Sequence, residues 1–358
     1  MADVAVVGAG IVGLAAAYAA RQRGADVTVY EPAAPGSGQS AGCSRIFRHA
    51  HDDPRMVTWA VRSRHIWCQW ERDFGTELLS ADGALSLGDG ALDKLRILAG
   101  IEGVEAARVD PDQVARALPI LAPYDGPAVL DTGGGSIRTE AAIAALTGAL
   151  HQGLVGEQVI TIGPAGSRVE VRTLTGRRRH DHVLVCAGAR TAELVPDMAI
   201  PVRLSAHVRL TFAVTGGARE RLATLQDSSG AFGATGVYAA AHTGNTRYSL
   251  GLSSTTDLTA PGGAQRLADL AEQARAYVAT ALPGLDPDPV GHVHCWVTEL
   301  PWGSDGVGVW QGPGVSAVVG HNLFKQAPAL GQALAQAALG EDLPADLAPA
   351  ARFGGPPH

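Results

Sequence analysis

The sequence predicts a mixed α/β and α+β fold, in which a Rossmann-like nucleotide-binding domain is interrupted by a β-rich domain. Residues 2–31 read as a strand, a glycine-rich turn, a helix and a second strand, which together form a βαβ unit. By contrast, residues 159–185 and 201–293 are dominated by β-branched and alternating runs that are typical of strands. Such an interrupted domain places a pocket at the domain junction, which is typical of an enzyme.

The first βαβ unit carries the pattern Gly-x-Gly-x-x-Gly at residues 8–13. Gly8 allows a tight turn, Gly10 lets a pyrophosphate approach the backbone, and Gly13 lets helix and strand pack closely. Glu31 ends the second strand, where a carboxylate can bond both ribose hydroxyls, so NAD or FAD is favoured over NADP. The glycines and the absence of a preceding basic residue argue against a signal peptide or membrane span.

The other elements follow in chain order, after an irregular Pro/Gly/Ser-rich loop at 32–42. Asp53-Pro54 is typical of a helix start, and Gly75 of a helix end. Thr139 is expected to cap an alanine-rich helix. We predict helices at 14–23, 54–74, 139–151, 263–282 and from 321–328 to 340, and strands at 2–7, 26–30, 83–87, 128–130, 159–162, 168–173, 182–185, 202–214, 236–241, 246–252, 292–298 and 315–320.

The order of these elements predicts two domains that the chain crosses between several times. Residues 1–80, 139–200 and 294–358 are expected to form the cofactor domain, and residues 81–138 and 201–293 the substrate domain. The strand at 182–185 closes in a small-residue turn, where the backbone of Gly188 can lie against a cofactor.

Composition narrows the class of protein. The 358 residues are 46% hydrophobic and 18% charged, as expected for a soluble globular protein, and we expect a cytoplasmic monomer. The formal net charge of −7 gives no reason to expect nucleic acid or an anionic membrane as a partner. The four cysteines lack the spacing of a disulfide framework or zinc site, and no metal is expected: Cys43, Cys68, Cys186 and Cys295.

Four motifs support a family resemblance. They are the βαβ unit with Glu31, Ser-Arg-Ile-Phe-Arg-His-Ala at 44–50, Cys-Trp-Val-Thr at 295–298, and Gly-His-Asn-Leu-Phe-Lys at 320–325. With these motifs the chain resembles, nearly end to end, the FAD-dependent amine oxidases of the monomeric sarcosine oxidase and N-methyltryptophan oxidase type, within the glycine and D-amino-acid oxidase group. The resemblance implies a glutathione-reductase-type FAD fold with FAD as cofactor.

The resemblance also implies roles for individual residues. Arg48 and Lys325 match the pair that holds a substrate carboxylate, and a planar fork beside a compact charge suits that task. Arg45 matches the arginine beside the flavin, and Cys295 the cysteine that carries flavin through an 8α-thioether. Further implied cofactor contacts are Ser44, Gly188, Gly320, Asn322 and Leu323, and Lys325 itself.

The sequence departs from the family at the oxygen site. The family has a lysine above the flavin that promotes electron transfer to oxygen, and Ser249 stands at the matching position here. Arg247 or a histidine would have to supply that charge. Tyr238 begins an altered pocket stretch, and we count it with Ser249 among the candidate catalytic residues; sarcosine itself is disfavoured as substrate. His49 and His51 have no role that the sequence suggests.

The implied reaction is oxidation of a secondary or cyclic amine bearing a carboxylate, an N-alkyl or imino amino acid. Hydride would pass to flavin N5, giving an imine and, with oxygen as acceptor, hydrogen peroxide. By analogy, a biosynthetic tailoring role is consistent with the altered pocket. Four alternatives stay open: a flavin dehydrogenase with another acceptor, a non-catalytic FAD-binding or redox-sensing protein, an NAD-linked dehydrogenase, and a flavin monooxygenase.

Overall fold

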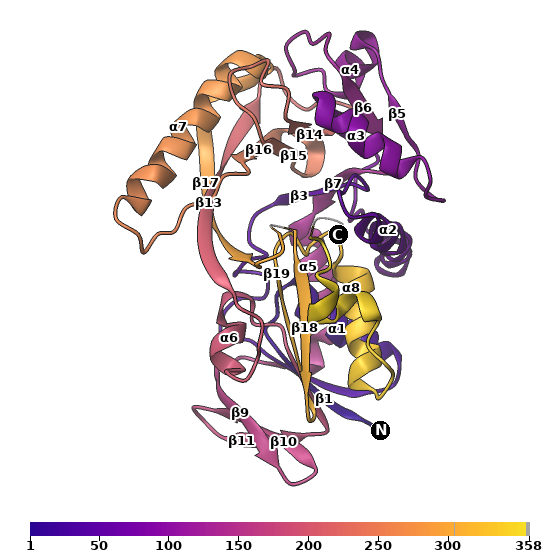
Figure 1. Ribbon diagram of the computed structural model, residues 1–358, viewed down its shortest axis with the longest axis vertical. Helices are drawn as coiled ribbons and strands as arrows, with labels where there is room; N and C mark the ends of the chain where they lie inside the picture. Colours follow the sequence, from indigo (N-terminus) through magenta and orange to yellow (C-terminus); the bar gives the residue numbers. More distant parts are fainter. Residues whose placement is uncertain (304, 356–358) are drawn as a thin grey trace. The chain divides into compact units, whose positions relative to one another are not determined.

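A computed structural model describes residues 1–303 and 305–355 of the chain, and Figure 1 shows it as a ribbon. The chain forms two compact units. Unit 1 comprises Met1–Ala41, Ala141–Leu204 and Thr298–His358, and unit 2 comprises Gly42–Glu140 and Ser205–Val297, with residues 304 and 356–358 outside the described part. Each unit is described separately below.

The centre of unit 1 is a six-stranded sheet with strand order β18-β19-β12-β1-β2-β8. Only β18 runs antiparallel to its neighbour, as expected where helical crossovers join parallel strands. The sheet therefore has the predicted Rossmann-like arrangement. The strand bounds are β1 Asp3–Val7, β2 Asp26–Tyr30, β8 Leu154–Val155, β12 His182–Val185, β18 Val307–Gly312 and β19 Val315–Gly320.

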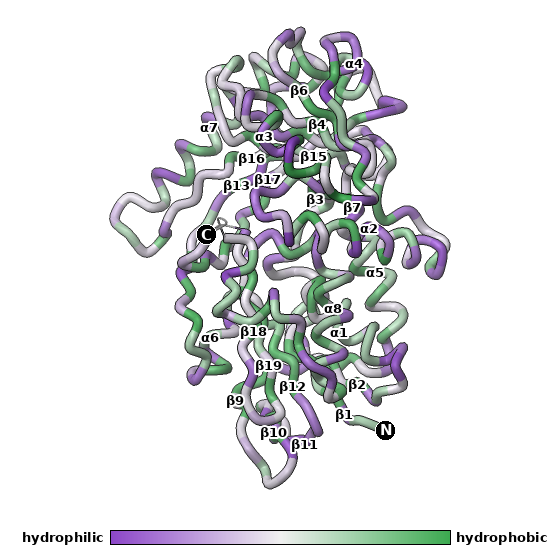
Figure 2. Tube along the Cα trace, turned by 45° about the vertical axis from the view of Figure 1, so that its right-hand side comes forward, coloured by the Kyte–Doolittle hydropathy of each residue, from purple (hydrophilic) through white to green (hydrophobic). Residues whose placement is uncertain are grey.

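Two apolar helices of unit 1, α1 (Ile11–Gln22) and α8 (Ala327–Ala338), pack closely together. A Cβ on Gly331 would lie only 2.6 Å from the backbone carbon of Ala15, so the absence of a side chain permits the contact. Figure 2 shows the apolar character of both helices. Unit 1 also contains the end of α5 (Thr139–Leu150), α6 (Thr191–Leu194) and a three-stranded antiparallel sheet of β9 Val159–Ala165, β10 Arg168–Thr173 and β11 Arg177–His180.

Unit 2 contains an eight-stranded sheet with strand order β17-β13-β16-β15-β14-β4-β6-β5. A second sheet pairs β3 with β7. The helix α7 (Gly263–Ala281) covers one face of the large sheet through a shared apolar core that includes Phe212, Tyr248 and Tyr277. The strand bounds are β3 Ser44–Phe47, β4 Ala84–Leu87, β5 Ala106–Arg108, β6 Ala128–Asp131, β7 Gly135–Arg138, β13 Arg203–Val214, β14 Thr224–Asp227, β15 Val237–Ala241, β16 Arg247–Leu252 and β17 Leu285–Glu299.

The predicted start and end of α2 (Pro54–Phe74) are confirmed. The Asp53 side chain accepts a hydrogen bond from the Arg55 backbone N–H, and Gly75 ends the helix in the left-handed conformation. The other two helices of unit 2 are α3 (Asp89–Leu98) and α4 (Pro111–Ala117). Among the described helices, none is both long enough and apolar enough to cross a bilayer.

The structure differs from the predicted elements in two respects. Seven strands were not predicted: β3, β5, β7, β8, β11, β14 and β18. Thr139 is the first residue of α5 instead of its cap, and its hydroxyl donates to the Gly42 carbonyl oxygen. Residues 42–80 lie in compact unit 2, where β3 pairs with β7. The functional domain ranges stay a prediction.

Candidate functional site

The glycine loop of unit 1 leaves no room for side chains. Gly8 has φ +104°, and a Cβ there would lie 2.5 Å from the Cys186 carbonyl oxygen. A Cβ on Gly13 would lie 2.0 Å from the Gly8 carbonyl oxygen. Both distances are far below van der Waals contact, so the predicted roles of these glycines in the turn and in helix packing are supported by this geometry.

The first turn of α1 presents backbone N–H groups next to this loop. Gly10 caps the helix without a side-chain hydrogen bond, and the first turn contains no acidic residue. Glu31 accepts hydrogen bonds from the Ala9 N–H at 2.9 Å and the Ala33 N–H at 3.0 Å, and the Ser40 hydroxyl accepts one from the Ile11 N–H at 3.0 Å. A helix N-terminus that begins at a glycine and has no acidic residue in its first turn, with a fixed carboxylate after β2, fits the diphosphate and ribose of a dinucleotide.

Gly188 lies just after β12 in unit 1, as predicted. It has φ +57°, and a Cβ there would come within 2.6 Å of Gln39 Oε1. The Gln39 amide in turn donates to the Thr298 hydroxyl at 2.9 Å. No sequence pattern pointed to Gln39 or Ser40, because both lie in the irregular loop after β2.

The motif at 320–325 forms a turn between β19 and α8. Gly320 has φ +155°, and Asn322 adopts the left-handed conformation with φ +55°. Leu323 lies close to Gly320, and Lys325 is only 5% exposed. Asp305 accepts a hydrogen bond from the Asn322 side-chain amide at 2.6 Å. This tight turn therefore buries a lysine beside an acidic residue.

The large sheet of unit 2 presents a set of polar side chains on the face opposite the α7 core. Strand pairing sets Arg209 and Tyr238 opposite Gly251, and Thr211 opposite Ser249. Because side chains alternate along a strand, these residues share one face, while Phe212 and Tyr248 point to the core. We call this set the polar face: Arg209, Thr211, Tyr238, Ser249 and Gly251.

Arg209 of the polar face and Arg45 of β3 share one hydrogen-bond acceptor. Both guanidinium groups donate to the Ser44 carbonyl oxygen, at 2.8 Å from Arg209 and 3.0 Å from Arg45. Burial, followed by repulsion from Arg209, lowers the pKa of Arg45 to about 9. The sequence singled out Arg45 but missed Arg209, whose position depends on strand pairing.

A hydrogen-bonded chain runs through Ser249. Its hydroxyl lies 2.6 Å from His242 Nε2 and 2.8 Å from the Thr211 hydroxyl. Burial, then the positive charges of Arg247 and Arg209, lower the pKa of His242 to about 4. The histidine that contacts Ser249 is therefore neutral at neutral pH, and Arg247 is exposed at the start of β16.

In unit 2, Cys295 is buried and Tyr238 is partly buried. The Tyr238 hydroxyl lies 3.2 Å from His207 Nε2, and burial raises the pKa of the phenol. Cys295 is a free thiol on β17, within electrostatic range of both Tyr238 and Arg45. The neighbouring Trp296 is 47% exposed, which is consistent with alternation along the strand.

The segment after β3 buries Arg48 and two histidines. A guanidinium nitrogen of Arg48 lies 3.5 Å from His51 Nδ1. His49 Nδ1 lies 3.0 Å from both carboxylate oxygens of Asp131, which also accepts from the His49 backbone N–H at 2.8 Å. His49 therefore fixes the chain next to β6, a structural role that the sequence did not reveal.

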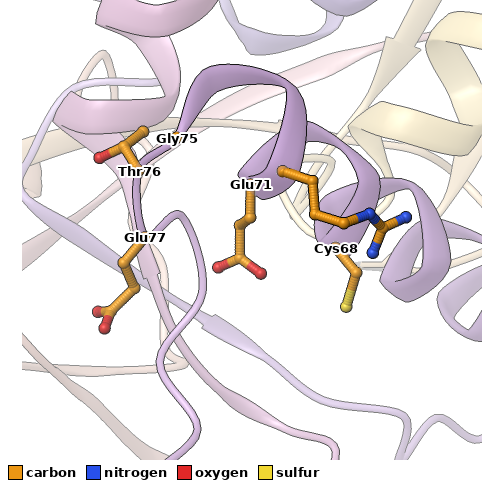
Figure 3. A pocket seen from close by; sticks show the side chains of 6 residues that line it. Cys68, Glu71, Gly75, Thr76 and Glu77 are labelled. Carbon is orange, nitrogen blue, oxygen red and sulfur yellow. The ribbon is translucent and has the colours of Figure 1, made fainter.

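A hollow of about 450 Å³ lies at the C-terminal end of α2 in unit 2 and contains none of the predicted site residues (Figure 3). Its lining residues are Cys68, Glu71, Arg72, Gly75, Thr76 and Glu77. Glu71 accepts hydrogen bonds from the backbone N–H groups of Leu78 and Leu79 at 3.0 and 2.9 Å. That carboxylate is thus used to fix the following chain segment.

Comparisons with known proteins agree with this arrangement. A family model described as DAO, FAD dependent oxidoreductase, matches residues 3–337. An N-methyl-L-tryptophan oxidase of Yersinia pestis (strain Pestoides F) is 30% identical over 216 residues, which cover 56% of this chain and 57% of that relative. The matched region thus spans little more than half the length of this curated relative.

Solved structures show the same fold. NikD, described as an unusual amino acid oxidase essential for nikkomycin biosynthesis, superposes with a TM-score of 0.81 at 20% identity, over 99% of this chain and 97% of NikD. Glycine oxidase from Geobacillus kaustophilus gives a TM-score of 0.77 at 20% identity, over 100% of this chain and 99% of that enzyme. The predicted fold class is confirmed.

Proposed function

Because the chain belongs to the family of FAD-dependent oxidoreductases, we propose that it oxidises a secondary or cyclic amine that bears a carboxylate. Bound FAD would supply the hydride acceptor, and the product would be an imine. The glycine loop and Glu31 of unit 1 would hold the cofactor. The family match favours FAD over the NAD alternative.

Two buried cationic side chains are the main reason for proposing a substrate that bears a carboxylate. Arg48 is 9% exposed and Lys325 is 5% exposed. The planar guanidinium of arginine and the compact ammonium of lysine both bind carboxylates well. We therefore assign these two residues to the substrate carboxylate.

We assign Cys295 to covalent attachment of the flavin and Arg45 to the positive charge beside it. The thiolate is the nucleophilic form of cysteine, and Cys295 is a buried free thiol. Its free state supports this assignment. Tyr238 and Ser249 would line the substrate pocket as hydrogen-bonding groups.

Oxygen can serve as the electron acceptor if a positively charged side chain promotes electron transfer to it. Neither Ser249 nor the neutral His242 supplies this charge, whereas Arg209 is buried on the same face of the sheet. We therefore propose oxygen as acceptor, with Arg209 as the charge that promotes the reaction. The lack of a lysine at position 249 makes a dehydrogenase with another acceptor the second candidate.

Two relatives support a particular substrate class. The N-methyl-L-tryptophan oxidase is named for an N-alkyl amino acid, and NikD is described as an amino acid oxidase in a biosynthesis. We propose accordingly an N-alkyl or cyclic imino amino acid, and a tailoring role in biosynthesis.

The test begins with the colour of the protein. Purified wild type, Cys295→Ala and the control Cys186→Ala are precipitated with acid, and the visible spectrum of precipitate and supernatant is recorded. We expect flavin to stay with wild type and Cys186→Ala but to leave Cys295→Ala. Flavin in every supernatant would refute the tether, and the absence of flavin after FAD reconstitution would refute the cofactor.

The substrate class is tested by anaerobic bleaching of the flavin band. N-methyl amino acids and cyclic imino acids are compared with the corresponding amines that lack the carboxylate. We expect bleaching only with the carboxylates, and loss of that preference in Arg48→Met. Failure of every carboxylate-bearing amine to bleach the flavin would favour the non-catalytic FAD-binding alternative.

A further inference from the structure

Strand pairing in unit 1 places an acidic residue beside Lys325. The antiparallel strands β18 and β19 set Val307 opposite Gly320, so the segment before β18 lies next to the turn after β19. Asp305 comes from the first segment, and Lys325 from the second. The Asp305 Oδ2 atom lies 4.0 Å from the Lys325 ammonium nitrogen.

The carboxylate of Asp305 is held in this position by a second group. Its Oδ1 atom accepts the hydrogen bond of 2.6 Å from the Asn322 amide. Asn322 adopts a left-handed conformation, with φ +55°, that asparagine tolerates better than most residues. The turn therefore directs a negative charge toward the lysine.

The two charges differ in burial. The Lys325 side chain is 6% exposed, whereas that of Asp305 is 22% exposed. An ammonium group has three donors, and its separation from Asp305 is at the outer limit of an ion pair. A second carboxylate that reached Lys325 would gain attraction from the ammonium and meet repulsion from Asp305.

We propose that Asp305 is a specificity-determining residue that competes with the substrate carboxylate for Lys325. This inference rests on the proposed function, in which Lys325 is one of two carboxylate-binding cations. Asp305 weakens the binding of carboxylates at this lysine and leaves neutral ligands unaffected. Arg48 then provides the stronger part of the carboxylate binding.

The lysine content of the chain allows a direct test. Lys94 and Lys325 are its only lysines, so a lysine-labelled holoenzyme gives two side-chain NMR signals, and Lys94→Arg assigns them. The signal of Lys325 is followed at pH 7 while propionate is added, and separately while its neutral isostere propionamide is added. Neither compound is an amine, so the measurement does not depend on turnover.

Three variants are compared with wild type. Asp305→Asn removes the competing charge, and Asn322→Gly removes the orienting amide while keeping a residue suited to positive φ. Asp342→Asn, at an exposed position of unit 1, makes the same change in net charge as the control.

We expect Asp305→Asn to tighten propionate binding about tenfold, or about 1.4 kcal/mol, without tightening propionamide binding. Asn322→Gly should give a smaller gain, and Asp342→Asn none. Unchanged or weaker propionate binding in both Asp305→Asn and Asn322→Gly would overturn the proposal, as would an equal gain for propionamide. Failure to bleach flavin with any amine would instead refute the proposed function and leave this measurement intact.

Discussion

The glycine loop of unit 1 is formed by backbone groups, whereas the polar face of unit 2 is formed by side chains. In the loop, a single methyl at Gly13 would collide with the carbonyl of Gly8. On the polar face, Arg209 and Ser249 come from neighbouring strands. The comparison suggests that substitutions in the loop disrupt its backbone, whereas a substitution on the polar face removes single side-chain interactions and leaves the backbone intact.

The largest effect is expected from Gly13→Ala. Its Cβ would lie 2.0 Å from a backbone oxygen, so the loop must open at a cost of roughly 3 kcal/mol, with loss of bound flavin. Flavin-to-protein ratio and urea unfolding measure both effects. The control is Gly38→Ala, since a Cβ there meets nothing within 4 Å. Full flavin content in Gly13→Ala would show that the loop can accommodate a side chain at position 13.

On the polar face, Arg209→Met should slow reoxidation of the reduced enzyme by oxygen about tenfold, or about 1.4 kcal/mol in the barrier. The variant loses a buried positive charge and its hydrogen bond of 2.8 Å to the Ser44 carbonyl. Arg209→Lys should retain part of the rate. Stopped-flow absorbance gives the rates, with Arg203→Met, exposed on the same strand, as the control. Equal rates in all four proteins would remove Arg209 from oxygen chemistry.

A histidine in each unit allows a matched pH experiment. Burial lowers the pKa of both His182 and His242 to about 4. As pH falls from about 6.5 to 4, the unfolded chain binds protons that the folded chain excludes, so the stability present above pH 6.5 is lost. Urea unfolding at pH 7 and 4.5 should show this loss, and His182→Gln and His242→Gln should each reduce it by about 1 kcal/mol. Unaltered pH dependence in both variants would show that neither group is buried in its neutral form.

The smallest effect is expected from Tyr238→Phe, which removes one hydroxyl of the polar face. Its contact of 3.2 Å with His207 suggests a loss of about 1 kcal/mol or less in the free energy of unfolding. Burial raises the pKa of the phenol, so it stays protonated, and the pH–rate profile up to pH 10 should keep its shape. If wild type lost activity at alkaline pH and Tyr238→Phe did not, Tyr238 would ionise during turnover.

Local sequence signals predicted the elements that local interactions determine. The Asp53-Pro54 start and Gly75 end of α2 are examples, since capping groups act within one helical turn. The strand β11 was missed, because Arg177–His180 contains no apolar alternation, as its hydrophilic colour in Figure 2 shows. Pairing with β10 forms that strand, and no local pattern records the pairing.

The same distinction applies to the candidate site. The spacing of the glycines at 8–13 is itself the signal of the loop, so it could be predicted from the sequence. Arg209 and Asp305 could not be found in this way. Their positions follow from the registers of β13 with β16 and of β18 with β19, which depend on residues far apart in the chain.

The division of the chain between the units also affects how the protein is made. Every residue of unit 2 precedes Thr298, whereas the sheet of unit 1 needs β18 and β19, and α1 needs α8 as its packing partner. During translation, unit 2 is therefore complete while unit 1 still lacks an edge of its sheet. The first βαβ unit therefore waits for its packing partner α8 until the last part of the chain has left the ribosome.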